Sequence, residues 1–480
     1  MDAGMEFSLQ VSQNKYLPAN GREMHAILSV VGESSGPEAV GPARADPRRL
    51  VEVLVIDCSG SMANPPTKIA AARRATAAAI DVLPDGVRFA VVEGTERARM
   101  VFPSESRLMT ASAETRAQAR AAVSRLSPGG GTAMGSWLAA ARDLLPDDPS
   151  AICHVLLLTD GINQHETPQE LERVLDTCAG RFVCDARGIG DGWHPRDLLR
   201  IAGVLRGTAE AVRRPAELEA GFRATIDAAL GKLLPDLRIR VQTMPYSTVA
   251  FVKQASPTLT DLTGYADTVD GRTVEVATGS WGAERRDYHL CLTVDPSVAH
   301  LEEDQMAARV TLLVEGEVRA GPAPVLVHWT DDLVKSSRLD PHVSHVTGQE
   351  EVRQAINAGC DAYDRGDRVE AHARWTRAVE LARLAHDEKA LEQLRYLVDL
   401  EPDGLVRLKP NLSRVDVNVS LLLSSQTVHA TGTPEPVPVA PVGEDRLCAA
   451  CGHLSPPDAV YCEQCDAVLD DPGRDGEEVT

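Results

Sequence analysis

The 480-residue sequence lacks the patterns that mark membrane proteins and several large classes of enzyme. No uninterrupted apolar run approaches the roughly eighteen residues of a membrane-spanning helix, and the N-terminal segment is not a basic stretch followed by an apolar one. The sequence also contains no glycine-lysine-serine phosphate loop, no HExxH motif and no nucleophile elbow. We therefore expect a cytoplasmic protein without enzymatic activity.

Basic residues are outnumbered. The chain has 49 lysines and arginines against 70 acidic residues, which gives a net charge of −21. Such a surface repels the phosphate backbone of a nucleic acid and attracts cations or basic groups more easily. The length predicts roughly two to four domains, and a hydrophobic content of 43% is enough for packed cores throughout.

Cysteines are few and fall into two groups. Six of the ten are scattered, several of them in apolar runs where a reduced thiol packs like a small apolar side chain. The other four form two C-x-x-C pairs that are separated by ten residues: Cys448 with Cys451, and Cys462 with Cys465. Four thiolates in this arrangement suit tetrahedral Zn²⁺.

A segment of only ~20 residues needs such a metal to fold. We therefore predict that residues 446–469 form a zinc ribbon, which resembles the small rubredoxin-knuckle modules. His453 is an alternative ligand that could replace one thiolate. Between its first and last cysteine the predicted ribbon has no lysine or arginine, which counts against contact with nucleic acid.

The stretch VEVLVIDCSGSM at residues 51–62 combines a strand with a cluster of oxygen donors. Its apolar first half, interrupted only by Glu52, is typical of a central parallel strand covered on both faces. Asp57, Ser59 and Ser61 follow where that strand ends, and ligands of open α/β sheets collect at the carboxyl ends of strands. Carboxylates and hydroxyls are hard donors of the kind that Mg²⁺ or Mn²⁺ prefers.

Two further segments supply matching donors. Residues 156–158 are a second apolar run that ends in Thr159 and Asp160, and a glycine-rich loop at residues 129–131 leads into Thr132. Aspartate and serine also crowd into turns because they cap helices and bond to local backbone, so one such motif alone would be ambiguous. Three segments with compatible donors favour a metal site.

At these positions the sequence resembles the von Willebrand factor A domain, whose metal-ion-dependent adhesion site has the pattern DxSxS, a downstream threonine and a later aspartate. The resemblance covers residues 50–233 and implies a doubly wound, mostly parallel α/β sheet, which the alternation of apolar runs and amphipathic helices also predicts. It further implies that Ser59, Ser61 and Thr132 bind the metal directly. Asp57 and Asp160 would act directly or through water, leaving an open position for a carboxylate of another protein.

The segments on either side of this domain have a different pattern. Short strands divided by Gly, Pro and Asp turns predict an antiparallel β-sandwich over residues 234–332. Two strands expected within residues 1–35 would complete it, so that the α/β domain is inserted between parts of one β domain.

The C-terminal third is predicted to be mixed. Residues 345–400 are typical of a helical hairpin that resembles one tetratricopeptide unit. A brace packed on neighbouring domains is favoured over a peptide-binding array, because one unit cannot bury its own face. We also expect a strand at residues 416–422, a proline-rich linker at 431–443 and an acidic, disordered tail at 470–480.

These domains favour a non-enzymatic adaptor that docks a protein partner through an Asp or Glu bound to the metal, with the tethered ribbon as a second contact surface. The combination resembles bacterial cytosolic proteins that act beside protein kinases, phosphatases or AAA+ ATPases, including the tellurite-resistance group, which implies a role in signalling or stress response. Two alternatives stay open: a nucleic-acid-associated protein, and a metal-dependent hydrolase. The hydrolase would need a His, Glu or Lys within hydrogen-bonding reach of the Asp57 cluster.

Overall fold

The computed structural model of the chain describes residues 5–34, 46–190, 192–212, 214–401, 405–427, 446–452 and 454–455. The chain divides into two compact units, Met1–Ala430 and Thr431–Thr480. The predicted linker at 431–443 and the predicted tail at 470–480 lie outside the described residues. Over the described part of the chain, no helix is long and apolar enough to cross a membrane.

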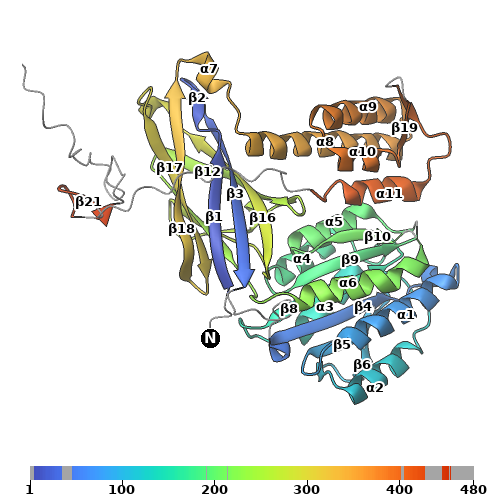
Figure 1. Cartoon of the computed structure of the whole chain (residues 1–480). Coiled ribbons are helices and arrows are strands. Elements are labelled where there is room, and N and C mark those ends of the chain that lie inside the picture. Colours follow the sequence, from blue (N-terminus) through green and yellow to red (C-terminus); the bar gives the residue numbers. More distant parts are fainter. Residues whose placement is uncertain are drawn as a thin grey trace, which may run out of the picture. The chain divides into compact units, whose positions relative to one another are not determined.

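A seven-stranded sheet forms the centre of the α/β domain (Figure 1). Its strands are β4 (Leu50–Asp57), β5 (Arg88–Gly94), β6 (Ala98–Phe102), β7 (Met109–Thr110), β8 (Ile152–Thr159), β9 (Val183–Ile189) and β10 (Ala209–Val212). They follow the order β10-β9-β8-β4-β5-β6, and β7 also pairs with β5. All neighbours from β10 to β5 are parallel, whereas β6 and β7 run antiparallel to β5.

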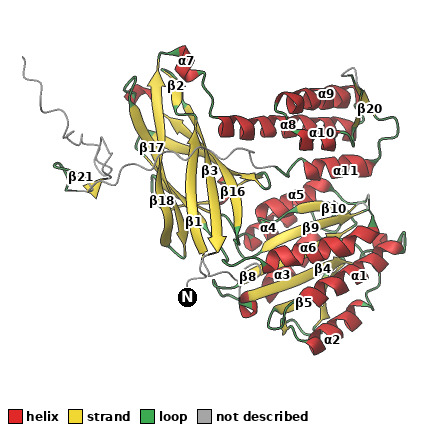
Figure 2. Cartoon of the chain, in the orientation of Figure 1, coloured by secondary structure: helices red, strands yellow, loops and turns green. Residues whose placement is uncertain are grey.

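Helices cover both faces of this sheet, as Figure 2 shows. They are α1 (Thr67–Val82), α2 (Ala113–Val123), α3 (Met134–Leu144), α4 (Pro168–Cys178), α5 (Pro195–Val204) and α6 (Leu218–Leu230). Apolar side chains of α1, α2 and α6 pack on one face, and those of α3, α4 and α5 on the other. Every residue of β4 is buried between the two layers. The predicted doubly wound α/β fold is confirmed.

Two further sheets make up the β-rich region. Their strands are β1 (Met5–Gln13), β2 (Tyr16–Pro18), β3 (Glu23–Ser34), β11 (Arg238–Thr243), β12 (Ser247–Ser256), β13 (Thr260–Asp261), β14 (Ala266–Thr268), β15 (Thr273–Ala277), β16 (Glu284–Val294), β17 (Asp304–Val314) and β18 (Glu317–Thr330). One sheet has the order β1-β3-β16-β12-β13, and the other has the order β14-β15-β11-β17-β18-β2.

The N-terminal strands belong to these sheets. β3 lies between β1 and β16 and is antiparallel to both. Leu28 and Val30 of β3 share one apolar core with Val310 of β17 and Val327 of β18 in the other sheet. The α/β domain therefore lies, in sequence, between two parts of a β-rich region.

A helical segment follows the last long strand. Its elements are α7 (Leu333–Ser336), α8 (Pro341–Asp364), α9 (Arg368–Leu384), α10 (Glu388–Leu394), a hairpin of β19 (Val398–Leu400) and β20 (Val406–Leu408), and α11 (Arg414–Leu423). It extends on both sides of the predicted hairpin at 345–400. α8 contacts β1 and β3, and α11 contacts α5 and β10, so the segment packs against both neighbouring regions.

The strand predicted at residues 416–422 is wrong, because these residues lie in α11. Ser413 and Asp416 form a reciprocal capping box that starts a helix. The alternating valines at positions 417 and 419 favour a strand only if one face is exposed. Here residues 417–422 are all buried. The alternation of valines with polar residues therefore does not correspond to one buried and one exposed face, as it would in a strand.

The second unit is described over a short hairpin only. β21 (Arg446–Leu447) pairs antiparallel with β22 (Leu454–Ser455). Gly452, at φ +73°, donates its N–H to the carbonyl of Cys448 at 2.8 Å. Cys448 and Cys451 therefore lie on one tight turn, as a C-x-x-C knuckle requires.

Candidate metal centre at the carboxyl edge of the sheet

Asp57 is the last residue of β4, and the chain turns sharply after it. Asp57 Oδ1 accepts a hydrogen bond from the N–H of Ser59 at 2.7 Å. A short 3-10 helix at Gly60–Ala63 then leads toward α1. Within this turn Ser59 Oγ and Ser61 Oγ are 2.9 Å apart, so both hydroxyls lie beside the carboxylate.

Asp160 reaches the same place from the neighbouring strand. β8 is parallel to β4, so their carboxyl ends meet at one edge of the sheet. Asp160 Oδ1 accepts a hydrogen bond from Ser61 Oγ at 2.6 Å. Thr159, the last residue of β8, donates its hydroxyl to Asp57 Oδ2 at 2.6 Å. The two strand ends are thus joined through their side chains.

Thr132 completes the cluster from the glycine-rich loop. Gly60 N–H donates to the carbonyl of Gly130 at 3.0 Å, which holds this loop against the turn after β4. A Cβ built on Gly161 would lie 2.9 Å from Thr132 Oγ1, 3.4 Å from Ser61 Oγ and 3.7 Å from Asp57 Oδ2. These oxygens therefore surround one small volume that only glycine leaves open, and all five predicted residues lie together around it.

Lys68 is a member of the cluster that the sequence reasoning missed. Its Nζ lies 2.7 Å from Asp160 Oδ2, and the residue is only 8% exposed. It sits in the first turn of α1, where Cα–Cβ bonds point back toward the helix N-terminus and hence toward the turn that holds Ser61. The position of Lys68 in the first helical turn after the Ser61 segment is the sequence signal that could have identified it. Lys68 also passes close to Gly190, since a Cβ there would lie 3.0 Å from Lys68 Cε.

The charges of the cluster do not cancel. Asp57 and Asp160 are both fully buried, and the ammonium of Lys68 is paired with Asp160. Burial raises the pKa of Asp57 to about 6; hydrogen bonds from Ser59 and Thr159 oppose this rise and the charge of Asp160 adds to it. Two ionised carboxylates and one ammonium leave a net charge of about −1 in a buried place, which is costly without a further cation.

The donor set fits a hard divalent cation. Two carboxylates and three hydroxyls offer oxygen alone, the preference of Mg²⁺ and Mn²⁺. Within the described ranges no group of three or more His, Cys, Asp or Glu residues is placed to hold a metal ion, so a site here would depend on the hydroxyls of Ser59, Ser61 and Thr132 as well as on the two carboxylates. Ser61 is exposed, which leaves one side of the cluster open to solvent.

Side chains of Glu96 and His165 hold the loops around the cluster. Glu96 Oε2 accepts the N–H of Gly131 at 2.8 Å, and this bond lowers the pKa of Glu96. His165 Nδ1 lies 3.2 Å from the N–H of Thr132. A hydrolase would need a His, Glu or Lys near the cluster as a base. Of these groups, Lys68 is paired with Asp160, and Nδ1 of His165 accepts a backbone N–H.

The second predicted metal site is described in part. Cys448 is buried and Cys451 is exposed. Cys462 and Cys465 lie outside the described residues, so the predicted set of four thiolates stays a prediction.

Comparisons with known proteins agree with this architecture. A family profile described as von Willebrand factor type A domain matches residues 52–211. The solved structure of a von Willebrand factor type A protein from Catenulispora acidiphila is 39% identical, covers 88% of this chain and 97% of its own, and superposes with a TM-score of 0.81. The ArnB paralog VWA2 from Sulfolobus acidocaldarius is 12% identical over 88% of this chain and 98% of its own, with a TM-score of 0.52, which shows a likeness of fold alone. No curated protein matches the chain.

The fold and the five converging side chains define a doubly wound α/β domain with a cluster of oxygen donors at the carboxyl edge of its sheet. The chain belongs to the von Willebrand factor type A family.

Proposed function

We propose that this protein is a non-enzymatic adaptor that docks a protein partner through a divalent cation held by Asp57, Ser59, Ser61, Thr132 and Asp160. Domains of this family often mediate protein interaction. The observation that carries the proposal is the buried, underneutralised cluster of oxygens with one side open to solvent. Mg²⁺ or Mn²⁺ would supply positive charge and an open coordination position there.

Lys68 gives the proposed site a definite charge. Two carboxylates and the ammonium sum to about −1, and a divalent cation changes this sum to about +1. A carboxylate from a partner would then neutralise the site, which is the reason for expecting an Asp or Glu in the partner. With the cation bound, the site would be a small region of positive charge on a protein that is acidic overall.

The wider role follows from the same proposal. The predicted zinc ribbon on Cys448, Cys451, Cys462 and Cys465 would be a second contact surface, and a cytoplasmic role beside a kinase, phosphatase or AAA+ ATPase remains the proposed setting. Hydrolysis is not proposed, because Lys68 is paired with Asp160, Glu96 accepts the N–H of Gly131 and Nδ1 of His165 accepts the N–H of Thr132.

Partner capture should depend on both the cation and Asp57. We expect Asp57→Ala to abolish measurable Mg²⁺ binding in calorimetry and to reduce capture of the main partner from lysate at least tenfold. This variant keeps the ion pair between Lys68 and Asp160, so the fold should persist. Asp143→Ala is the matched control, since Asp143 is exposed on α3 of the same domain. Capture that survives both EDTA and Asp57→Ala in folded protein would refute metal-dependent docking.

Lys68→Met should change metal binding in the opposite direction. Without metal the variant should melt at a lower temperature, because buried Asp160 loses the ammonium 2.7 Å away. Mg²⁺ should bind roughly tenfold more tightly, because the ammonium of Lys68 no longer repels the cation. Melting curves and calorimetry with Mg²⁺ measure both effects. Lys389→Met, at an exposed position of α10, is the control. Equal or weaker Mg²⁺ binding would show that Lys68 and the cation do not share the site.

A further inference from the structure

A small cavity with charged residues in its lining lies at the opposite end of the α/β sheet from the candidate metal centre. Its volume is about 240 Å³. His154 and Asp185 line it from β8 and β9, and Glu284 and Arg286 line it from β16 of the β-rich region. Because it lies between both regions and carries charged groups from each, it has the character of a ligand site.

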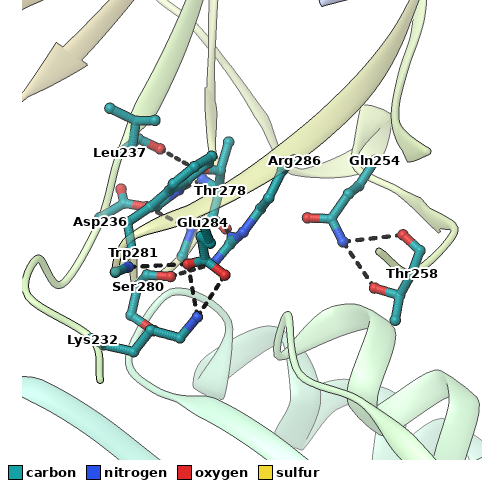
Figure 3. A network of polar contacts seen from close by, with 12 residues as sticks. Lys232, Asp236, Leu237, Gln254, Thr258, Thr278, Ser280, Trp281, Glu284 and Arg286 are labelled. Atoms are coloured by element: carbon teal, nitrogen blue, oxygen red, sulfur yellow. Dashed lines mark hydrogen bonds and ion pairs between the residues drawn. The ribbon is translucent and has the colours of Figure 1, made fainter. Parts of the chain in front are cut away.

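Glu284, one of two acidic residues that line the cavity, is already paired. Lys232 Nζ lies 2.7 and 2.9 Å from its two oxygens, and Arg286 Nη2 lies 2.8 Å from Oε1 (Figure 3). Burial opposes ionisation, but the charges of Arg286 and Lys232 lower the pKa of Glu284 to about 2. Arg286 also donates to the carbonyls of Thr278 and Ser280. This carboxylate is therefore charged and satisfied.

Asp185, the other acidic residue, is satisfied as well. Its Oδ1 accepts the N–H and the hydroxyl of Thr208 at 2.6 and 2.7 Å. Its Oδ2 lies 3.2 Å from Nε2 of His154. Four basic side chains line the cavity, namely His154, Arg206, Lys232 and Arg286, against these two carboxylates. His154 is also paired with the buried Glu52, so one positive charge is in excess.

Arg206 is the cation of the cavity whose Nε has no partner. This nitrogen is buried and has no hydrogen-bond acceptor. Burial lowers the pKa of Arg206, and the charge of the neighbouring Asp236 opposes this change. The charged neighbour Asp236 accepts the N–H groups of Thr278 and Gly279 at 3.1 and 2.8 Å and pairs with Arg238 at 3.5 Å. A buried guanidinium N–H without an acceptor is expensive, because its hydrogen bond to water is lost.

The backbone of Arg206 is strained as well. Arg206 follows the C-cap of α5 with a φ of +56°, a position where helices favour glycine and where another residue costs roughly 1–2 kcal/mol. Gly279, itself at positive φ, packs against the stem of the side chain, since a Cβ there would lie 3.4 Å from Arg206 Cβ and Cδ. An arginine that is strained and whose Nε has no acceptor indicates a role outside folding.

We propose that the cavity binds a small oxyanion, a phosphate or carboxylate group, through the guanidinium of Arg206. The planar fork of arginine matches both groups. A neighbouring cleft of about 570 Å³ shares Val183, Arg206 and Ser280 with the cavity, so it offers a route to the guanidinium and room for the rest of a larger ligand.

Calorimetric titration of the full chain with inorganic phosphate and, separately, with acetate tests the proposal and distinguishes the two groups. EDTA is present and chloride holds the ionic strength constant, so that neither a bound metal nor screening contributes. We expect saturable binding of at least one anion, and a loss of tenfold or more in affinity with Arg206→Gly. Because glycine suits the positive φ, this variant should melt at or above the wild-type temperature without anion.

Two matched variants complete the test. Arg206→Lys keeps the charge without the fork and should bind more weakly than wild type. Arg238→Gln removes an arginine of the adjoining cleft that already pairs with Asp236, Asp267 and Glu275, and it should bind like wild type. Absence of saturable binding of both anions by the wild type, or wild-type affinity in Arg206→Gly, would overturn the proposal.

Discussion

Replacing His154 by Gln is expected to lower the free energy of unfolding by about 3–5 kcal/mol at neutral pH. His154 on β8 is nearly fully buried between two carboxylates. Its Nδ1 lies 2.8 Å from Glu52 Oε2 on β4, and its Nε2 lies 3.2 Å from Asp185 Oδ2 on β9. The neutral amide would leave both carboxylates in the interior without their cation. Urea unfolding measures the loss.

The effect should depend on pH in a defined direction. Burial alone would lower the pKa of His154, but the charge of Glu52 and the contacts with Asp185 outweigh it and raise the pKa from the ordinary 6.5 to about 10. The folded state thus favours the protonated ring. Its contribution is complete below about pH 6.5 and is lost as the pH rises toward 10. The difference between wild type and His154→Gln should therefore shrink over this interval.

Two further variants identify the cause. Glu52→Gln together with His154→Gln removes one charge of each sign and should recover more than about 1 kcal/mol of the loss, since fewer unpaired charges stay buried. His300→Gln, at an exposed position, should stay within about 0.5 kcal/mol of wild type. A loss below about 1 kcal/mol in His154→Gln would show that the carboxylates do not rely on the imidazole.

The candidate site could be located from sequence because its residues follow recognisable strands. Asp57 comes directly after an apolar run, and Asp160 follows another with Thr159 between. The carboxyl ends of neighbouring parallel strands meet at one edge of the sheet. Thr132 was found through the glycine-rich loop before it. These are local signals, and the structure joins them.

The basic residues that pair with the buried carboxylates could not be found in this way. Lys68 and Asp160 are 92 residues apart, and Glu52 and His154 are 102 apart. Glu52 interrupts an apolar run in the sequence, and nothing near it reveals that a histidine on the next strand is its partner. Pairing of this kind depends on strand register, which periodicity does not encode across such separations.

The error at α11 has a similar origin. Local alternation favoured a strand at residues 416–422, but the helix buries two sides at once. Val417 and Leu421 pack into the core of α8, α9 and α10, whereas Leu422 packs into the core beneath α3, α4 and α5. Because α11 is buried on two sides, its polar and apolar residues do not follow the helical period that one exposed face would produce.

This arrangement makes Leu422 a point where the helical segment and the α/β domain depend on each other. Leu422→Asp is expected to lower the free energy of unfolding by about 4 kcal/mol or more, because a residue that is 1% exposed would place an unpaired carboxylate in an apolar core. Val369→Asp makes the same change at a residue that is 83% exposed in the first turn of α9, where an acid suits the helix dipole; it should stay within about 0.5 kcal/mol. Urea unfolding followed by tryptophan fluorescence measures both variants, since Trp375 lies in the helical core and Trp193 in the core of the α/β domain. If Leu422→Asp unfolds like the Val369→Asp control, α11 does not join the two cores in solution, and the helical segment must be held to the α/β domain by other contacts.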